Sequence, residues 1–371
     1  MRISKVQSII LGGNKYNWAC LAKRRIAESI TRKYYSDLKP EINPEVTELL
    51  KGLRDGRRAS LATAITLVET ENVRKKKLAN RLLNHIMQES QVPTSYRIGI
   101  SGPPGAGKST FIEAFGKFLT SMGHRVAVLA VDPSSSSTGG SLLGDKTRMP
   151  ELTRDPNAYI RPSPARGFLG GVTRSTNESI VLCEYANYDM ILVETVGVGQ
   201  SEYAVANMVD IFVVLLPPGG GDELQGVKRG IVEKADLLVV TKGDGDLLPA
   251  AHRTQYEYTA AIKFMRPTNP KWKTKVLQVS SKTKTGLDTF WEQVNNFKEV
   301  TKEDFLAKRG DQREVWMWTH VQEGLERVLL RDSRLKHLTN SLLDSVRDGK
   351  ISPGSAADEI LSLFEISEKK L

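Results

Sequence analysis

The chain has 371 residues, a formal net charge of +10 and a pI of about 9.4. Residues 1–36 contain eight basic residues and one acid, a net charge of +7, so the rest of the chain is close to neutral. A protein that binds nucleic acid through diffuse basicity would spread its charge more widely. No apolar run approaches the ~18 residues of a membrane span. We therefore expect neither a nucleic-acid partner nor a membrane association.

Cysteine and histidine are scarce, which limits redox and metal chemistry. The chain contains two cysteines, Cys20 and Cys183, and five scattered histidines. We expect neither a disulfide framework nor a Cys-based zinc site. A hard ion held by oxygen ligands stays compatible with this composition.

The first segment, residues 1–36, has the character of an organelle transit peptide. It is rich in Arg and Lys, and Ile26, Ile30 and Tyr34 recur at helical spacing beside basic residues. Residues 32–36 resemble a matrix-processing site. We expect targeting to the mitochondrial matrix, with a disordered basic tail as the alternative.

Residues 37–92 form a predicted N-terminal helical extension. Pro44 follows Asn43, which is a favourable start for a helix. Apolar residues recur at helical spacing through residue 86. The basic run Arg74–Lys77 is interpreted as a solvated helix face rather than a binding site.

Residues 93–300 alternate short apolar runs with helical patterns. Strands are predicted at 96–101, 126–131, 190–194, 211–216, 237–241 and 276–280, and helices at 108–122, 223–235, 250–265 and 287–298. This alternation predicts an α/β domain with a mostly parallel central sheet. Residues 301–371 return to a helical pattern, with a last helix at 356–364. Trp316 and Trp318 are expected to pack in a core or a dimer seam.

A glycine-rich loop carries the strongest motif. It matches GxxxxGK[ST] between a predicted strand and helix, which predicts a P-loop NTPase. Convergent backbone N–H groups and a helix N-terminus would hold phosphate oxygens, with Lys108 reaching the β- and γ-phosphates and Ser109 binding Mg²⁺. The predicted nucleotide-binding residues are Gly102, Pro103, Pro104, Gly105, Ala106, Gly107, Lys108, Ser109 and Thr110.

Carboxylates at predicted strand ends are candidates for the other Mg²⁺ ligands. Asp132 and Glu194 each end an apolar strand, and Asp145 lies in a glycine-rich loop. Helix capping is the alternative role for such acids. Ser109, Asp132, Asp145 and Glu194 are thus the predicted metal ligands.

The segment after Glu194 corresponds in position to a γ-phosphate sensor. Gly197 would sense the γ-phosphate through its amide, and Gln200 is a candidate for orienting water, although its spacing differs from that in small GTPases. Arg148 and Lys228 are candidates for neutralising charge in the transition state, with ordinary surface roles as the alternative. Together with Lys108 and Glu194, these side chains are the predicted catalytic residues.

Base selection is predicted by two later loops. Thr241, Lys242 and Asp244 resemble the guanine-selective NKxD motif, with Thr in place of Asn. Guanine offers N1–H and N2–H₂ donors to a carboxylate, whereas adenine would leave the carboxylate unpaired. Ser280, Ser281 and Lys282 match the short loop whose backbone contacts the guanine oxygen. GTP and GDP are therefore the expected ligands, and Thr241 is expected to weaken one base contact.

Longer segments carry a family resemblance. The chain resembles the mitochondrial form of the MeaB / methylmalonic aciduria type A protein family. The members of this family are P-loop GTPases that serve methylmalonyl-CoA mutase. The resemblance covers about residues 43–365. The segments that carry it are Val131–Ser136, Gly139–Met149, Val193–Glu202 and Pro217–Lys228.

The resemblance implies a role, a set of partners and the use of several segments. Residues 219–228 would form an additional switch, residues 301–371 a dimerisation arm and residues 37–92 a partner-facing extension. GTP hydrolysis would gate adenosylcobalamin loading and protect methylmalonyl-CoA mutase. The implied partners are the mutase, the cobalamin adenosyltransferase and a second copy of the chain.

Two alternatives follow from the same motifs. A P-loop kinase or ATPase acting on a small molecule would share the phosphate-binding loop, but the sequence shows no distinct acceptor base or lid. A nucleic-acid-binding role lacks a basic patch interleaved with aromatic residues. Because no arginine finger or well-placed water-orienting group is evident, we expect slow intrinsic turnover.

Overall fold

The computed structural model describes most of the chain from residue 43 onward. Contacts divide the chain into two compact units, Met1–Gln91 and Val92–Leu371. The predicted transit segment and the predicted site residues Asp132, Asp145, Gly197 and Lys228 lie outside the described residues. The described ranges are 43–70, 72–89, 94–131, 148–161, 169–195, 200–219, 229–265, 269–331 and 333–365.

The first unit contains three mutually packed helices. They are α3 (Pro44–Arg54), α4 (Arg58–Val68) and α5 (Val73–Glu89). Asn43 caps α3 by accepting a hydrogen bond from the Glu45 N–H at 2.9 Å, and Pro44 begins the helix as predicted. Most of the basic run Arg74–Lys77 is exposed, as expected of a solvated helix face.

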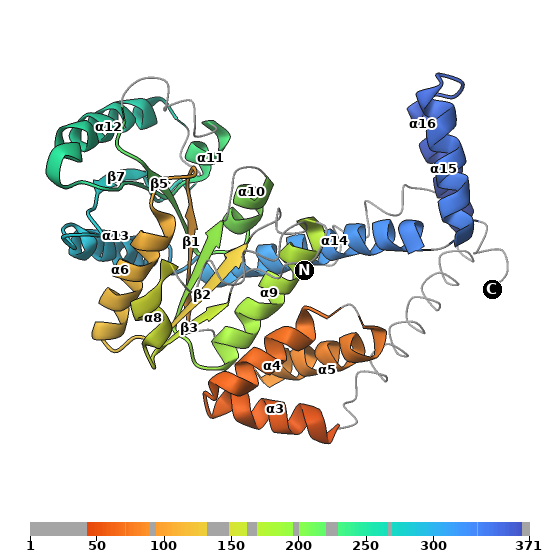
Figure 1. The fold of residues 1–371 in the computed structure, drawn as a ribbon, viewed down its shortest axis with the longest axis horizontal. Coiled ribbons are helices and arrows are strands. Elements are labelled where there is room, and N and C mark those ends of the chain that lie inside the picture. The colour runs from red at the N-terminus through yellow and green to blue at the C-terminus, as the bar shows by residue number, and fades with distance from the viewer. Residues whose placement is uncertain are drawn as a thin grey trace. The chain divides into compact units, whose positions relative to one another are not determined.

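The second unit is built on a parallel sheet (Figure 1). Within the described residues it has seven strands in the order β3-β2-β4-β1-β5-β6-β7, and all its ladders are parallel. The strands are β1 (Tyr96–Ser101), β2 (Val126–Val131), β3 (Ala158–Arg161), β4 (Met190–Thr195), β5 (Ile211–Leu216), β6 (Leu237–Val240) and β7 (Lys275–Gln278). The predicted α/β fold class is confirmed.

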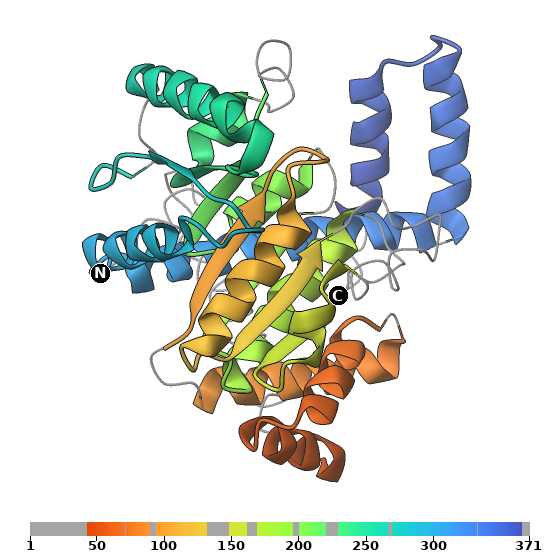
Figure 2. The ribbon, with the colours of Figure 1, turned by 60° about the vertical axis from the view of Figure 1, so that its left-hand side comes forward.

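Helices cover both faces of this sheet (Figure 2). The helices of the second unit are α6 (Lys108–Ser121), α8 (Pro150–Arg154), α9 (Leu169–Tyr185), α10 (Gln200–Ala206), α11 (Arg229–Lys234), α12 (Leu248–Ala261), α13 (Leu287–Val300), α14 (Phe305–Arg331), α15 (Ser333–Arg347) and α16 (Pro353–Glu365). Two 3₁₀ turns, η2 (Gly245–Leu247) and η3 (Ile262–Phe264), flank α12. Such two-sided cover explains why β2, β5 and β6 are buried and apolar at every position rather than alternating.

The two faces of the sheet have different cores. Ile98 and Ile100 of β1 pack with the aromatic side chains of α6 and α13, where the rings of Phe111 and Phe290 meet edge to face. Gly99 points to the opposite face, because side chains alternate along a strand. A Cβ placed there would lie 2.8 Å from Val209 and 3.0 Å from Val205, so α10 packs closely on this face.

Some elements were not predicted. Strand β3 has only four residues and ends in Arg161, which leaves too short a pattern to recognise. Helix α9 mixes glycine and hydroxyl residues, and its apolar positions show no clear helical period. Helix α10 has seven residues, fewer than a periodicity argument needs.

The C-terminal segment α14–α16 begins with a 27-residue helix, about 40 Å long. Helix α15 packs against both α14 and α16. The two tryptophans predicted to share a core or seam differ: Trp316 is 8% exposed, whereas Trp318 is 56% exposed. Among the described helices, none is long and apolar enough to cross a membrane.

Candidate functional site

The predicted phosphate loop joins β1 to α6. Gly102 has a φ of 150°, and a Cβ there would lie 2.5 Å from the Leu215 carbonyl oxygen, so only glycine fits beside β5. Gly107 precedes α6 in the left-handed region, with a φ of 83°. Since glycine brings no side chain to cap the helix, the first N–H groups of α6 are left to face a ligand.

Lys108 folds back over this loop. Its Nζ donates to the carbonyl oxygens of Gly102 at 2.7 Å and Pro103 at 3.2 Å. Burial lowers the pKa of Lys108 from its ordinary value, while the charges of Glu194 and Glu202 act in the opposite direction. A phosphate bound in this loop would therefore lie close to a half-buried ammonium group, with which it could form a charged hydrogen bond.

Ser109 and Glu194 come together as the sequence predicts for two Mg²⁺ ligands. Ser109 Oγ donates to Glu194 Oε1 at 3.3 Å, and Glu194 lies near the carboxyl end of β4, next to β1. Adjacent ligands around an octahedral Mg²⁺ with bonds of about 2.1 Å lie about 3 Å apart. The hydroxyl and the carboxylate are thus hard oxygen donors at a separation that fits this ion.

The remaining predicted catalytic residues are described only in part. Arg148 is exposed, just before α8, and its charge contributes to lowering the pKa of Lys108. Gln200 is the first residue of α10, five positions after the end of β4. Arg148 therefore lies within electrostatic range of the phosphate loop.

Glu202 is a site residue that the sequence did not single out. It is 5% exposed in the first turn of α10, and its charge acts on Lys108. An acid at this position resembles an ordinary favourable charge at a helix N-terminus. Only the burial of Glu202, which the sequence does not reveal, distinguishes it from such a residue. The structure adds this second carboxylate to the surroundings of Lys108.

Thr241 connects the predicted base-recognition loop to the predicted phosphate loop. The side chain is 2% exposed, and its Oγ1 donates to the Ala106 carbonyl oxygen at 2.7 Å, with the Leu216 carbonyl at 3.2 Å as a second acceptor. The Thr241 hydroxyl thus donates its hydrogen bond within the protein. This contact fixes the end of β6 against the loop that follows β1.

Asp244 and Ser280 come from different loops and meet directly. Ser280 Oγ donates to Asp244 Oδ1 at 2.7 Å and accepts from the Thr283 N–H at 3.1 Å. These bonds orient the carboxylate. Lys242 and Lys282 are exposed, and Ser281 is partly buried. The loops follow β6 and β7, at the same edge of the sheet as the phosphate loop, because all the strands run parallel.

Asp244→Asn is expected to lower GTP affinity by about a hundredfold or more. The carboxylate would accept two guanine N–H groups, each hydrogen bond to a charged acceptor is worth about 1.5–3 kcal/mol, and 1.4 kcal/mol is tenfold in affinity. Titration with a fluorescent GTP analogue measures the change. Asp246→Asn, the same substitution at an exposed position two residues away, is the control. Equal affinities for both variants would contradict the role of Asp244.

Comparisons with known proteins identify the family of the chain. The family model described as "Methylmalonyl Co-A mutase-associated GTPase MeaB" matches residues 61–333. A Mus musculus protein named "Methylmalonic aciduria type A homolog, mitochondrial" is 53% identical over 86% of this chain and 80% of its own. A Caulobacter vibrioides protein named "Putative GTPase" is 48% identical over 86% of this chain and 98% of its own.

A solved structure shares the fold. The crystal structure of an LAO/AO transport system kinase is 34% identical, covers 88% of this chain and 100% of its own, and has a TM-score of 0.70. The family match spans well over half of the chain and includes both the phosphate loop and the Asp244–Ser280 pair. The chain belongs to the MeaB family of methylmalonyl-CoA mutase-associated GTPases.

Proposed function

We propose that this GTPase gates the loading of adenosylcobalamin into methylmalonyl-CoA mutase and protects the mutase through cycles of GTP binding and hydrolysis. The carrying observation is that a phosphate loop with Ser109 beside Glu194 shares one sheet edge with the oriented carboxylate of Asp244, in a chain of this family. This arrangement supports a nucleotide switch that selects guanine. The link to the mutase rests on the family.

Different groups of the chain have different proposed roles in the transfer of the phosphate to water. Backbone N–H groups of the loop and of the first turn of α6 would bind phosphate oxygens, and Lys108 would neutralise charge that develops there. We propose that Ser109 and Glu194, together with Asp132 and Asp145, hold Mg²⁺, which when bound supplies positive charge against the phosphate oxygens.

Hydrolysis by the isolated chain is proposed to be slow. Gln200 and Gly197 are the proposed groups for orienting water and sensing the γ-phosphate, and Arg148 and Lys228 are the proposed cations for the transition state. Residues 219–228 are proposed as a switch through which a partner reaches these groups. Stimulation by the partner would then complete the site, as a group supplied in trans does for other GTPases.

Purified chain mixed with methylmalonyl-CoA mutase is expected to form a complex and to hydrolyse GTP at least about tenfold faster than the chain alone, because the partner completes the site. Phosphate release and gel filtration measure the two effects. ATP in place of GTP is the control for the base, and an unrelated protein at equal concentration is the control for the partner. An unchanged rate without complex formation would contradict the chaperone role, and tighter binding of ATP would favour a kinase or ATPase.

The C-terminal segment α14–α16 is proposed to form a homodimer. Trp318, Val321 and Leu325 lie on one face of α14 at a spacing of three and four residues, and each is more than 40% exposed. Large apolar side chains gathered along one exposed helix face are typical of an interface. A second copy of the chain is the proposed occupant.

Leu325→Asp is expected to convert the dimer to a monomer, because a charge buried in an apolar seam without a partner is costly. Light scattering after gel filtration measures the mass. Leu306→Asp is the matched control: Leu306 is 52% exposed on the same helix, but about 100° around it from Leu325. A monomeric wild-type chain would contradict the proposed dimer.

Localisation and a further partner complete the proposal. Relatives from Mus musculus and Caenorhabditis elegans are named mitochondrial. We propose that residues 1–36 direct the chain to the mitochondrial matrix. The cobalamin adenosyltransferase is proposed as an additional partner, since it would supply the cofactor whose loading is gated.

A further inference from the structure

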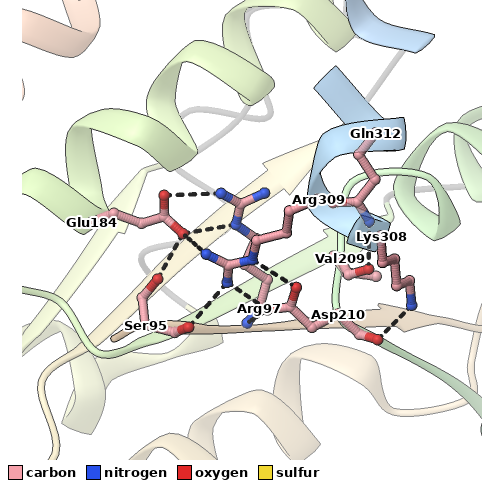
Figure 3. Close-up of polar contacts among 8 residues, drawn as sticks. All are labelled: Ser95, Arg97, Glu184, Val209, Asp210, Lys308, Arg309 and Gln312. Atoms are coloured by element: carbon pink, nitrogen blue, oxygen red, sulfur yellow. Dashed lines mark hydrogen bonds and ion pairs between the residues drawn. The ribbon is translucent and has the colours of Figure 1, made fainter. Parts of the chain in front are cut away.

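A buried ionic network fixes the start of α14 to the sheet (Figure 3). Arg309 is fully buried and donates to both carboxylate oxygens of Asp210, at 2.9 and 2.6 Å, and to Glu184 at 3.1 Å. Asp210 immediately precedes β5, and Glu184 lies at the end of α9. This bidentate pair is a strong and directional attachment.

Two further side chains of α14 bind the backbone just before Asp210. Gln312 Nε2 donates to the Val209 carbonyl at 2.8 Å, and Trp316 Nε1 donates to the Asn207 carbonyl at 3.2 Å. Positions 309, 312 and 316 share one helix face. The connection 207–210 links α10 to β5, and α14 contacts almost the whole length of this connection.

The other end of α10 lies beside the nucleotide site. Glu202, in its first turn, is buried and within electrostatic range of Lys108. In the middle of this stretch, Val205 and Val209 pack on Gly99, three residues before the phosphate loop, with no room for a Cβ between them. Because α10 is a single short helix about 10 Å long, a displacement at its start reaches the connection 207–210.

We propose that α10 and the connection 207–210 transmit the presence of the γ-phosphate to α14. In this proposal the hydrogen bonds of Gln312 and Trp316 form in one nucleotide state and break in the other, whereas Arg309 stays attached in both. The single hydrogen bonds from neutral groups are weaker than the charged bidentate pair, so they are the contacts that break first. The C-terminal segment α14–α16 would then differ in position between the GTP and GDP states. This inference rests on the proposed GTP switch.

Thermodynamic reciprocity supplies the test: if the nucleotide acts on α14, α14 must act on the nucleotide. The double variant Gln312→Met and Trp316→Phe removes both N–H donors and keeps a side chain of similar length at 312 and an aromatic ring at 316. In the full chain, the ratio of the dissociation constants for fluorescent GDP and a non-hydrolysable GTP analogue is expected to shift by at least about threefold. Arg313→Met, at an exposed position of the same helix that lies away from Trp318 and Leu325, is the control and leaves the ratio unchanged.

A folded double variant with the wild-type ratio overturns the coupling. If the double variant does not fold, hydrogen exchange of the wild-type chain decides: amides in 207–210 and 305–316 are expected to exchange at different rates with GDP and with the GTP analogue, and equal rates overturn the proposal. A wild-type chain that binds no GTP refutes the proposed function together with the coupling. GTP binding with an unchanged ratio refutes the coupling alone.

Discussion

Lys108→Ala is expected to lower the rate of GTP hydrolysis by about 10²–10³-fold or more, to the limit of detection. The ammonium group approaches the carbonyls of Gly102 and Pro103 at the mouth of the loop, and Ala leaves no cation there. Removing one preorganised donor to developing charge typically costs this much in rate. Phosphate release under saturating GTP measures the effect, and nucleotide titration shows how much of it is lost binding.

Lys117→Ala separates this effect from damage to the helix. Lys117 also lies on α6, but it pairs with Asp155, away from the loop. Its loss removes a cation from the same helix without touching the nucleotide site, so hydrolysis is expected to stay near the wild-type rate. Wild-type hydrolysis by Lys108→Ala would mean that the assigned active site is wrong.

The phosphate site could be predicted from the sequence because its geometry is local. Between Gly102 and Ser109, the glycines, the lysine and the hydroxyl are held by one turn between a strand and a helix. Ser109 and Glu194 are 85 residues apart, but their proximity follows from a general rule of topology: the carboxyl ends of parallel strands meet at one edge of the sheet. Most strands were likewise found, because fully buried strands are short continuous apolar runs.

Contacts between distant segments that follow from no such rule of topology could not be predicted. Arg309 lies in a polar run from Lys308 to Arg313 that reads as a solvated helix face, yet it is fully buried. Its partner Asp210 is 99 residues away in the sequence. Only the tertiary fold brings the pair together, so no spacing rule could identify it.

The two tryptophans show a second limit. Trp316 and Trp318 are two residues apart, which places them about 200° apart around a helix. One is buried against the connection to β5 and the other is exposed. Both belong to an apolar pattern with no single period, so the sequence could not assign one of them to the core and the other to a surface.

Thr241 shows how the structure changes the meaning of a departure from a motif. In the sequence, Thr in place of Asn predicts a weaker contact with the base. In the structure, its hydroxyl supports the Ala106 carbonyl of the phosphate loop. The residue therefore links the end of β6 to the phosphate loop, and the selection of the base is proposed to depend on Asp244 and Ser280.

Arg309→Met is expected to lower the free energy of unfolding by about 3–5 kcal/mol, because breaking a buried ion pair by removing one partner leaves an uncompensated charge. Asp210 loses both guanidinium bonds and keeps the Arg97 N–H at 2.8 Å, while Glu184 keeps Arg97 itself. Urea denaturation followed by fluorescence measures the loss. Arg313→Met, at an exposed position one turn further along α14, is the control, with an expected change within about 0.5 kcal/mol.

The deficit of Arg309→Met is expected to depend on pH. Burial opposes the ionisation of Glu184, but Arg97 and Arg309 together outweigh it and hold its pKa below the ordinary value. Stability from such a carboxylate is present above its unfolded pKa of about 4.3 and is lost as the pH falls through the lower folded pKa. Without Arg309 the pKa of Glu184 in the folded state rises. The free energy of unfolding of Arg309→Met is therefore expected to differ most from that of the wild type at pH 7, and the difference decreases below about pH 4. A difference that stays constant from pH 7 to pH 3 would show that Arg309 acts through its packing rather than through its charge.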